Sequence, residues 1–420
     1  MEIMKLPITD LKPAVYNPRK NLKSGDPEYE KLRRSFQEFG YVEPIVWNRQ
    51  TQTIVGGHQR LKVLAEMGET EIECVIVDMP QEKEKALNVA LNKINGQWDE
   101  ELLAGLLKDL ETQAIDLAIT GFDVSEIESL MKQFDKSEAA EDDFDTEKAL
   151  EEIVEPVSKR GDIWILGRHR LMCGDSTVMA DVEKLMDGAL ADMVFTDPPW
   201  NVDLGGDPTH PSWKPRQILN DSMSTEDFKD FMNKTFACMY GILKPGGMMY
   251  VVMSAQEWGN CMLTLKENGF HWSSTIIWNK DRIVLSRKDY HTRYEPIWYG
   301  WHNGAPRRCP LEDRKQCDVW DIPRPSVSEL HPTTKPIELV ARAIKNSSYP
   351  DHVVVDLFGG SGTTLIAAEQ TNRSCFMGEM DEKYCDVIAK RFALQTGRHD
   401  GIYVLRDGEK IGWESLCPEK

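Results

Sequence analysis

The sequence lacks several features that would assign it to a common class of protein. It has no run of about eighteen apolar residues that could cross a membrane, and its start, MEIMKLPITDLKP, lacks the basic and then apolar pattern of a secretion signal. Its nine cysteines include no C-x-x-C pair, so neither a metal site nor a disulfide framework is expected. We therefore expect an intracellular, cytoplasmic protein with reduced thiols.

Positive charge is also scarce, because 50 Lys and Arg residues face 69 Asp and Glu residues and leave a net charge of −19. This balance argues against a protein that coats nucleic acid with its whole surface. The charge is unevenly placed, however. Asp135 to Glu155 contain ten acids and two lysines, whereas Lys280 to Lys315 contain nine Lys or Arg residues and five acids. The basic stretch is compatible with a local contact to DNA.

The length of 420 residues predicts two domains with connecting segments. Short extended runs and helical patterns predict a small α/β domain over residues 1–95, followed by a helical extension over residues 96–134. Residues 135–157 have too few large apolar side chains for a core and are interpreted as a solvated acidic linker. Residues 158–400 alternate apolar strands with helices, which predicts an open, doubly wound α/β sheet, and residues 401–420 are interpreted as a C-terminal tail.

A glycine-rich loop, FGGSGTT, follows the apolar strand at residues 353–356. Gly359, Gly360 and Gly362 permit a tight turn before a helix whose N-terminus presents unpaired backbone amides. The loop lacks the lysine of a phosphate-binding P-loop. It fits either a dinucleotide or S-adenosylmethionine, because Glu379 has the spacing of an acid that binds ribose hydroxyls. A purely structural glycine turn is the remaining alternative.

A second motif, Asp197-Pro198-Pro199-Trp200, closes the apolar strand ADMVFT. The prolines remove backbone donors, so the Asp197 carboxylate and the Pro198 carbonyl form a rigid pair of acceptors. Two acceptors suit an exocyclic base amine, whose nitrogen becomes more nucleophilic when both of its N–H groups are bound. Trp200 offers a flat face on which an extruded base can stack. Cytosine C5 methylation is disfavoured, because no Pro-Cys pair is present to supply a nucleophile. A strand-ending proline turn is the bland alternative.

Taken together, the two motifs resemble those of the β group of DNA amino-methyltransferases, in which the catalytic motif precedes the cofactor loop. The resemblance covers residues 158–400 and implies a Rossmann-like methyltransferase sheet, S-adenosylmethionine as the cofactor, and catalysis at residues 197–200. In that family the position of Asp175 contacts the adenine end of the cofactor, and a lysine like Lys335 lies near its carboxylate. The full set of cofactor residues that the resemblance implies is Asp175, Lys335, Asp356, Phe358, Gly360, Gly362, Thr363 and Glu379.

An aromatic residue after Asp-Pro-Pro resembles adenine N6 enzymes more than cytosine N4 enzymes, in which serine is commoner at the Asp position. We therefore predict a site-specific methyltransferase that acts on adenine N6 of double-stranded DNA, with cytosine N4 as the alternative. RNA and protein amines stay open as substrates. Target recognition is placed near residues 280–320, where cations contact phosphates and guanine edges. The predicted DNA contacts are Arg282, Arg287, Lys288, Arg293, Arg307 and Arg308.

YNPRKN and IVGGHQRLKVLAEMG resemble the N-terminal fold of ParB and sulfiredoxin proteins over residues 1–95. The G-E-R-R segment of nucleotide-binding members reads GHQR at residues 57–60 here, and His58 stands where sulfiredoxins carry a reactive cysteine. Neither the activity of the nucleotide-binding members nor that of the sulfiredoxins is therefore carried over. The sequence leaves open a nucleotide or phosphate near Arg19 and Arg60, a partner for this domain, and a homodimer. A second hypothesis is a ParB-like DNA-binding regulator whose methyltransferase domain is inert.

Overall fold

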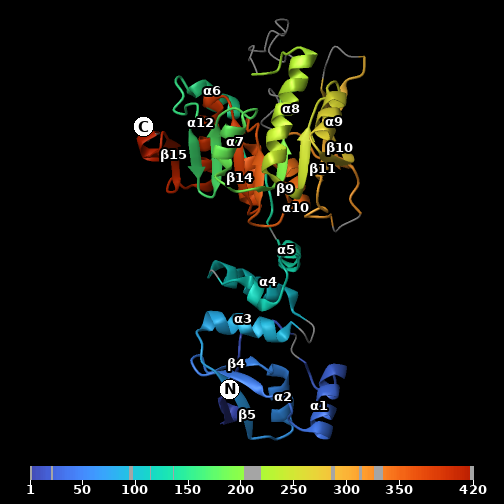
Figure 1. Cartoon of the computed structure of the whole chain (residues 1–420), viewed down its shortest axis with the longest axis vertical. Coiled ribbons are helices and arrows are strands. Elements are labelled where there is room, and N and C mark those ends of the chain that lie inside the picture. The colour runs from blue at the N-terminus through green and yellow to red at the C-terminus, as the bar shows by residue number, and fades with distance from the viewer. Residues whose placement is uncertain are drawn as a thin grey trace. The chain divides into compact units, whose positions relative to one another are not determined.

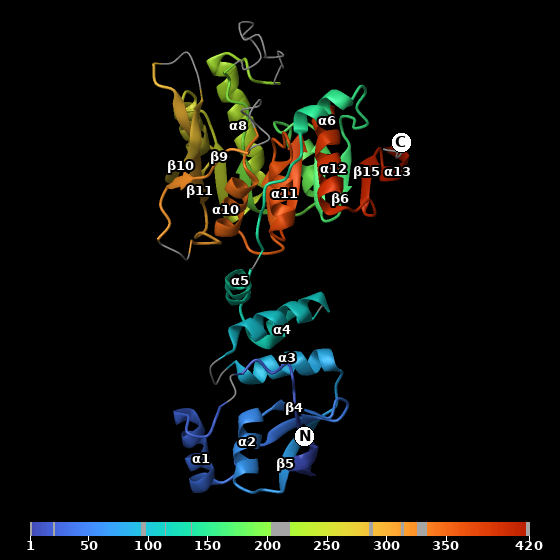
Figure 2. The same ribbon diagram turned by 180° about the vertical axis from the view of Figure 1, so that it is seen from behind.

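The computed structural model divides into two compact units, Met1–Asp135 and Lys136–Lys420, which Figures 1 and 2 show from opposite sides. No helix in the described part of the chain is long and apolar enough to span a membrane. The structure describes residues 2–19, 22–93, 98–113, 115–135, 137–202, 219–284, 289–311, 315–325 and 334–416.

The N-terminal unit contains a five-stranded sheet in the order β1–β5–β3–β4–β2. Its strands are β1 (Glu2–Pro7), β2 (Lys12–Pro13), β3 (Ile45–Asn48), β4 (Thr53–Gly56) and β5 (Glu71–Val77). The helices α1 (Pro27–Phe39) and α2 (His58–Glu66) pack on it around Ile45, Ile54 and Val63. In β5, burial alternates along the strand, as expected of a sheet that is covered on one face. The predicted small α/β fold is confirmed.

Three helices complete this unit: α3 (Gln81–Asn92), α4 (Glu100–Thr112) and α5 (Val124–Gln133). They share a separate apolar cluster that includes Val89, Leu103 and Leu107. Asp99 caps α4, since its side chain accepts the Leu102 N–H at 3.1 Å. A capping box begins α5. The residues predicted as a helical extension therefore form a packed helical assembly with its own core.

The C-terminal unit is built on an eleven-stranded sheet, ordered β12–β10–β11–β9–β8–β13–β14–β7–β6–β15–β16. Its centre, from β9 to β7, is parallel, and antiparallel strands flank it on both sides. The predicted doubly wound sheet is confirmed, although the antiparallel edges make it mixed. The strands are β6 (Ile163–Leu166), β7 (His169–Cys173), β8 (Ala191–Thr196), β9 (Leu243–Val252), β10 (Phe270–Val284), β11 (Thr292–His302), β12 (Val319–Asp321), β13 (Val353–Asp356), β14 (Ser374–Glu379), β15 (Ile402–Arg406) and β16 (Glu409–Gly412).

Helices cover both faces of this sheet, with α7 to α9 on one side and α10 to α12 on the other (Figures 1 and 2). Strand β8 is buried along its whole length, because Met193 and Phe195 face one apolar core and Val194 faces the other. From β8 the chain proceeds to β9 on one side, and from β13 it proceeds to β14 on the other side. The boundary between β8 and β13 is therefore a topological switch point. The helices are α7 (Met179–Met186), α8 (Thr225–Ile242), α9 (Trp258–Glu267), α10 (Ile337–Ser347), α11 (Thr363–Gln370) and α12 (Glu382–Thr396).

Two segments differ from the sequence-based predictions. Residues 402–412, expected in a C-terminal tail, form β15 and β16, because the apolar alternation of IYVLR allows pairing with β6 and burial of Val404. The segment expected to be a solvated linker includes α6 (Thr146–Glu152), which packs on α12 through Ala149, Leu150 and Val387. Because α6 buries only Ala149 and Leu150, the composition of this acidic segment did not indicate a packed helix.

Candidate active site

A cavity of about 480 Å³ lies at the carboxyl ends of the parallel strands, with residues that follow β7, β8, β9, β13 and β14 in its wall. Its described lining contains two lysines, Lys280 and Lys335. It also contains seven carboxylates: Glu147, Asp197, Asp221, Glu295, Asp356, Glu379 and Asp381. This charge disfavours the pyrophosphate of a dinucleotide, which the glycine loop alone left open, and favours a ligand that carries positive charge.

Most of the predicted catalytic and cofactor residues meet in this cavity. Asp175 and Gly362 lie just outside its lining, although Gly174 and Ser176 belong to it. Asp175 accepts the Thr177 N–H at 2.9 Å and shapes the turn after β7. The predicted residues that line the cavity are Asp197, Pro198, Pro199, Trp200, Lys335, Asp356, Phe358, Gly360, Thr363 and Glu379.

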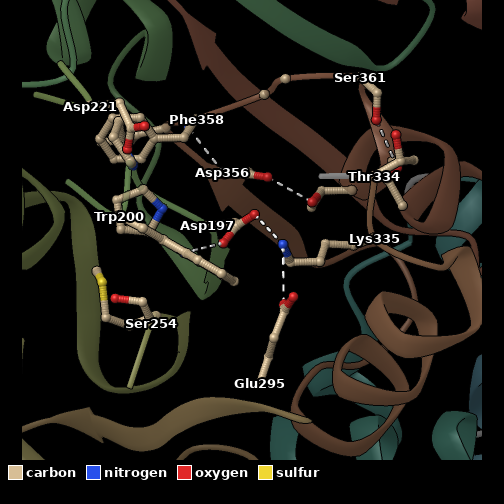
Figure 3. A pocket seen from close by; sticks show the side chains of 18 of the residues that line it. Asp197, Trp200, Asp221, Ser254, Glu295, Thr334, Lys335, Asp356, Phe358 and Ser361 are labelled. Carbon is tan, nitrogen blue, oxygen red and sulfur yellow. Dashed lines mark hydrogen bonds and ion pairs between the residues drawn. The ribbon is translucent and has the colours of Figure 1, made fainter. Parts of the chain in front are cut away.

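The Asp197 carboxylate lies at the end of β8 between two donors (Figure 3). Lys335 Nζ is 2.6 Å from Oδ2, and the Trp200 indole N–H donates to Oδ1 at 3.1 Å. Burial and the negative charge of Glu295 raise the pKa of Asp197 above its usual value, whereas Lys335 opposes that rise. Each carboxylate oxygen has two lone-pair sites, so Asp197 can accept a further N–H from a bound base.

Lys335 links Asp197 to a more deeply buried carboxylate, Glu295, whose Oε2 lies 3.3 Å from the Lys335 Nζ. Glu295, on β11, also pairs with Lys280 on the adjacent strand β10, and both side chains are only 5% exposed. Burial by itself would lower the pKa of Lys335, but Asp197 and Glu295 outweigh it and hold that pKa above its usual value. The four residues form a chain of alternating charges, in which every buried ion has a partner.

The structure adds a contact that was not predicted for Lys335, whose role beside the cofactor stays a prediction. The resemblance implies a place near the cofactor's carboxylate, and in the structure its ammonium group contacts the Asp197 carboxylate and lies 4.9 Å over the Trp200 ring. Lys280 and Glu295 were not among the functional residues predicted from the sequence. The available signal was a charged residue inside an apolar strand, in STIIWNK and in EPIWYGW, because such a residue needs a buried partner.

Asp356 holds the glycine loop to the neighbouring strand. Its carboxylate accepts the hydroxyls of Thr196 and Thr364 at 2.9 and 2.7 Å and the Phe358 N–H at 3.1 Å. Burial raises the pKa of Asp356 to about 7. Protein donors bind both of its oxygens, so Asp356 fixes the shape of the loop, and its contact with a cofactor stays a prediction.

Glu379, at the end of β14, closes the same side of the cavity. Its two oxygens accept the N–H groups of Gly360 and Asp381, each at 2.8 Å. Burial raises the pKa of Glu379 to about 7. Gly360 and Gly362 have φ values of 51° and 83°, in the left-handed region where a side chain would be strained, so the loop requires glycine there. The backbone can therefore come close to a ligand beside Glu379.

The predicted DNA contacts separate into two places. Arg282 is exposed near the cavity end of β10, and Arg293 donates to the Lys280 carbonyl at 2.9 Å. Arg307 and Arg308 follow the other end of β11, where the Arg308 N–H bonds to the carbonyl of Gly246 near the start of β9. Arg282 and Arg293 therefore lie near the cavity, whereas Arg307 and Arg308 lie toward the opposite edge of the sheet, and all four stay predicted DNA contacts. Arg287 and Lys288 lie outside the described residues.

In the N-terminal unit, Arg60 forms an ion pair with Glu43. His58 Nε2 accepts the Ala14 N–H at 3.2 Å, and burial together with the charge of Arg19 lowers the pKa of His58 to about 4. His58 is thus a neutral structural histidine. Within the described residues, no group of three or more His, Cys, Asp or Glu side chains is placed to hold a metal ion.

Comparison with known proteins identifies three regions. Residues 191–391 match a family described as DNA methylase. This match lies within the C-terminal unit, which is called the methylase domain below. Residues 1–93 match the ParB N-terminal domain, and residues 101–160 match the ParB-methyltransferase HTH domain. The resemblances stated from the sequence are confirmed, whereas the helix-turn-helix assignment was missed, because the helical pattern alone does not distinguish it from other helix pairs.

Two relatives and one solved structure illustrate the similarity of the methylase domain. The DNA adenine methyltransferase YhdJ of Escherichia coli strain K12 is 28% identical over 251 residues, which cover 52% of this chain and 81% of that protein. The type II methyltransferase M2.MboI of Moraxella bovis is 26% identical over 222 residues, which cover 48% and 80%. The M1.HpyAVI–SAM complex is 21% identical, covers 53% of this chain and 98% of its own, and gives a TM-score of 0.41.

Proposed function

We propose that the methylase domain transfers a methyl group from S-adenosylmethionine to N6 of adenine in double-stranded DNA. The observation that carries this proposal is the partly buried Asp197 carboxylate, which pairs with Lys335 and lines the same cavity as the glycine loop. The Asp197 carboxylate and the Pro198 carbonyl accept the two N–H groups of a flipped adenine, which directs the nitrogen lone pair out of the ring plane. Trp200 lines the same cavity and supplies an aromatic face for the base.

The described lining fits the proposed donor. S-adenosylmethionine, when bound, supplies a methyl group on a positively charged sulfur, and the cavity has an excess of carboxylates. Glu379 offers acceptors for ribose hydroxyls, and the left-handed turn at Gly360 lets the backbone approach the ligand. Phe358 contributes an apolar surface, and its ring lies 5.9 Å from that of Phe231. The residues that hold the donor are thus those of the glycine loop and the end of β14.

The choice of adenine over cytosine rests on Asp197 at the first position of the proline turn, where the family's cytosine N4 enzymes more often have serine. The relative named a DNA adenine methyltransferase supports the same choice. Cytosine N4 is the alternative, because its exocyclic amine offers the same two N–H groups to Asp197 and Pro198. An inert methylase domain is disfavoured, since the intact DPPW and FGGSGTT motifs line one cavity.

DNA binding is assigned to the rim of the cavity and to the N-terminal unit. Arg282, whose side chain is 60% exposed, lies near Val284, which lines the cavity, and is suited to a phosphate contact. We infer that the helix-turn-helix region adds a second contact. Removal of residues 1–134 is expected to lower DNA affinity, and an unchanged affinity and methylation pattern would contradict this role.

The proposed function is tested by incubating duplex DNA with the full chain and methyl-labelled S-adenosylmethionine. Mass spectrometry of the digested nucleosides is expected to show label in N6-methyladenine. Label in N4-methylcytosine would establish the alternative base, and label in competing RNA or protein would change the substrate class. A chain that fails to bind the donor would support the inert regulator.

Replacing Glu379 with glutamine should weaken donor binding about 10- to 100-fold, because a charge-assisted hydrogen bond to a ribose hydroxyl contributes about 1.5–3 kcal/mol. The Kd for S-adenosylmethionine is measured by calorimetry, and kcat at saturating donor should change little. Glu267→Gln, a surface change on α9, serves as the control. A Glu379→Gln variant with the Kd of the unaltered protein would remove Glu379 from the binding site.

A further inference from the structure

The acidic segment at residues 137–153, called the strap below, is attached to the methylase sheet along much of its length. Ala140 exchanges two hydrogen bonds with the Gln370 side chain at the end of α11, at 2.9 and 3.1 Å. Glu141 accepts the Glu338 N–H at the start of α10, at 3.0 Å. Seen from behind in Figure 2, α6 lies beside α12. The strap therefore lies over the helices that cover one face of the sheet.

One contact connects the strap directly to the glycine loop. Arg391 on α12 donates from Nε and Nη2 to both carboxylate oxygens of Asp142, at 2.7 and 2.8 Å. The same guanidinium donates from Nη1 to the Ser361 carbonyl at 2.9 Å and lies 3.3 Å from the Thr363 hydroxyl. The Arg391 and Asp142 side chains are only 4% and 12% exposed. Asp142 thus fixes the planar guanidinium of Arg391, whose third nitrogen, Nη1, binds the glycine loop.

The strap also forms part of the cavity wall. Thr146 and Glu147, in the first turn of α6, line the cavity together with Met380 and Tyr384, which follow Glu379. Burial of Ala149 and Leu150 against Val387 holds α6 in this place. The wall on the Glu379 side is therefore built from two segments that are far apart in sequence, the strap and the region after β14.

We propose that the strap is a structural part of the methyl-donor site and that Asp142 is a positioning residue for donor binding. This proposal rests on the proposed function and adds a determinant of donor affinity outside the methylase motifs. The match to the ParB-methyltransferase HTH domain, residues 101–160, crosses the boundary between the two units and includes the strap. Donor affinity thereby depends on the segment that joins the helix-turn-helix region to the methylase domain.

The test compares two substitutions in the full chain. Asp142→Asn keeps the size of the side chain but removes its charge, which loosens Arg391 and the loop. We expect the Kd and the KM for S-adenosylmethionine to rise about tenfold. At saturating donor, kcat should stay within about twofold, because Asp142 lies outside the cavity lining. Glu152→Gln is the matched control, since its ion pair with Lys390 also joins the strap to α12, at 2.7 Å, but both of its side chains are exposed.

Three outcomes would overturn the proposal: an Asp142→Asn variant with unchanged Kd and KM, a loss of kcat without a change in KM, or an equal effect of Glu152→Gln. Should Asp142→Asn fail to fold, hydrogen exchange on the unaltered chain decides, since bound donor should slow exchange of the amides of residues 140–152. Absence of that protection refutes the strap's role. An unaltered chain that binds no donor refutes the proposed function itself, whereas normal methylation with a normal Asp142→Asn variant refutes only the strap proposal.

Discussion

Replacement of Asp197 with alanine or asparagine should lower kcat for methyl transfer by about 10³-fold, the upper part of the range for losing one preorganised electrostatic group. Alanine removes the acceptor that binds the adenine amine. Asparagine keeps the shape, but it loses the charge and places an NH₂ group where an acceptor is needed. Donor affinity should stay within about twofold, because the glycine loop and Glu379 are held by their own hydrogen bonds.

Single-turnover transfer of labelled methyl groups to duplex DNA measures this effect without interference from product release. The variants should fold, since Lys335 keeps Glu295 as a partner after Asp197 is removed. Asp230→Asn on α8 is the control, because its exposed pair with Lys234 lies on the helix surface. An Asp197→Ala variant that kept more than about a tenth of the rate would refute the proposed catalytic role.

The positions of the two motifs could be predicted from the sequence, because each motif directly follows an apolar strand. Asp197 ends one apolar strand and Asp356 ends another, and the carboxyl ends of parallel strands meet at the same edge of a sheet. That rule brings DPPW and FGGSGTT into one cavity without any knowledge of side-chain contacts. The identity of the ligand did not follow from the loop alone, because its charge preference depends on the whole lining.

The contacts that were missed depend on pairing between distant segments. Glu295 reaches Lys280 because β10 and β11 pair with Trp278 opposite Glu295, a register that sequence spacing does not reveal. The same hairpin explains the failure to group the basic residues. The eleven residues of β11 span about 30 Å, so Arg293 and Arg308 lie near opposite ends of this strand. The prediction grouped these arginines because it counted charges along the sequence, where they lie in one basic stretch.

Replacement of Lys335 with methionine should lower kcat near neutral pH by about 100-fold, with partial recovery as the pH rises. When Asp197 is ionised, its carboxylate accepts hydrogen bonds from the base amine, Lys335 and Trp200 more strongly than a protonated carboxyl does. Burial and Glu295 already raise its pKa, and Lys335 is the group that opposes them. Without Lys335 that pKa rises further, so the acid limb of the pH profile of kcat should move to higher pH.

Glu295→Gln should move the same limb in the opposite direction, because it removes a negative charge that raises the pKa of Asp197. The profiles are compared at saturating donor and DNA, since kcat then reports groups in the bound complex. Glu295→Gln leaves the buried Lys280 without its ion-pair partner. If this single variant does not fold, the double variant Lys280→Met and Glu295→Gln replaces it, because it removes both charges of the pair. We expect Lys335→Met and Glu295→Gln to shift the acid limb in opposite directions, because Lys335 lowers the pKa of Asp197 and Glu295 raises it. Shifts in the same direction would show that these two charges do not set the ionisation of Asp197.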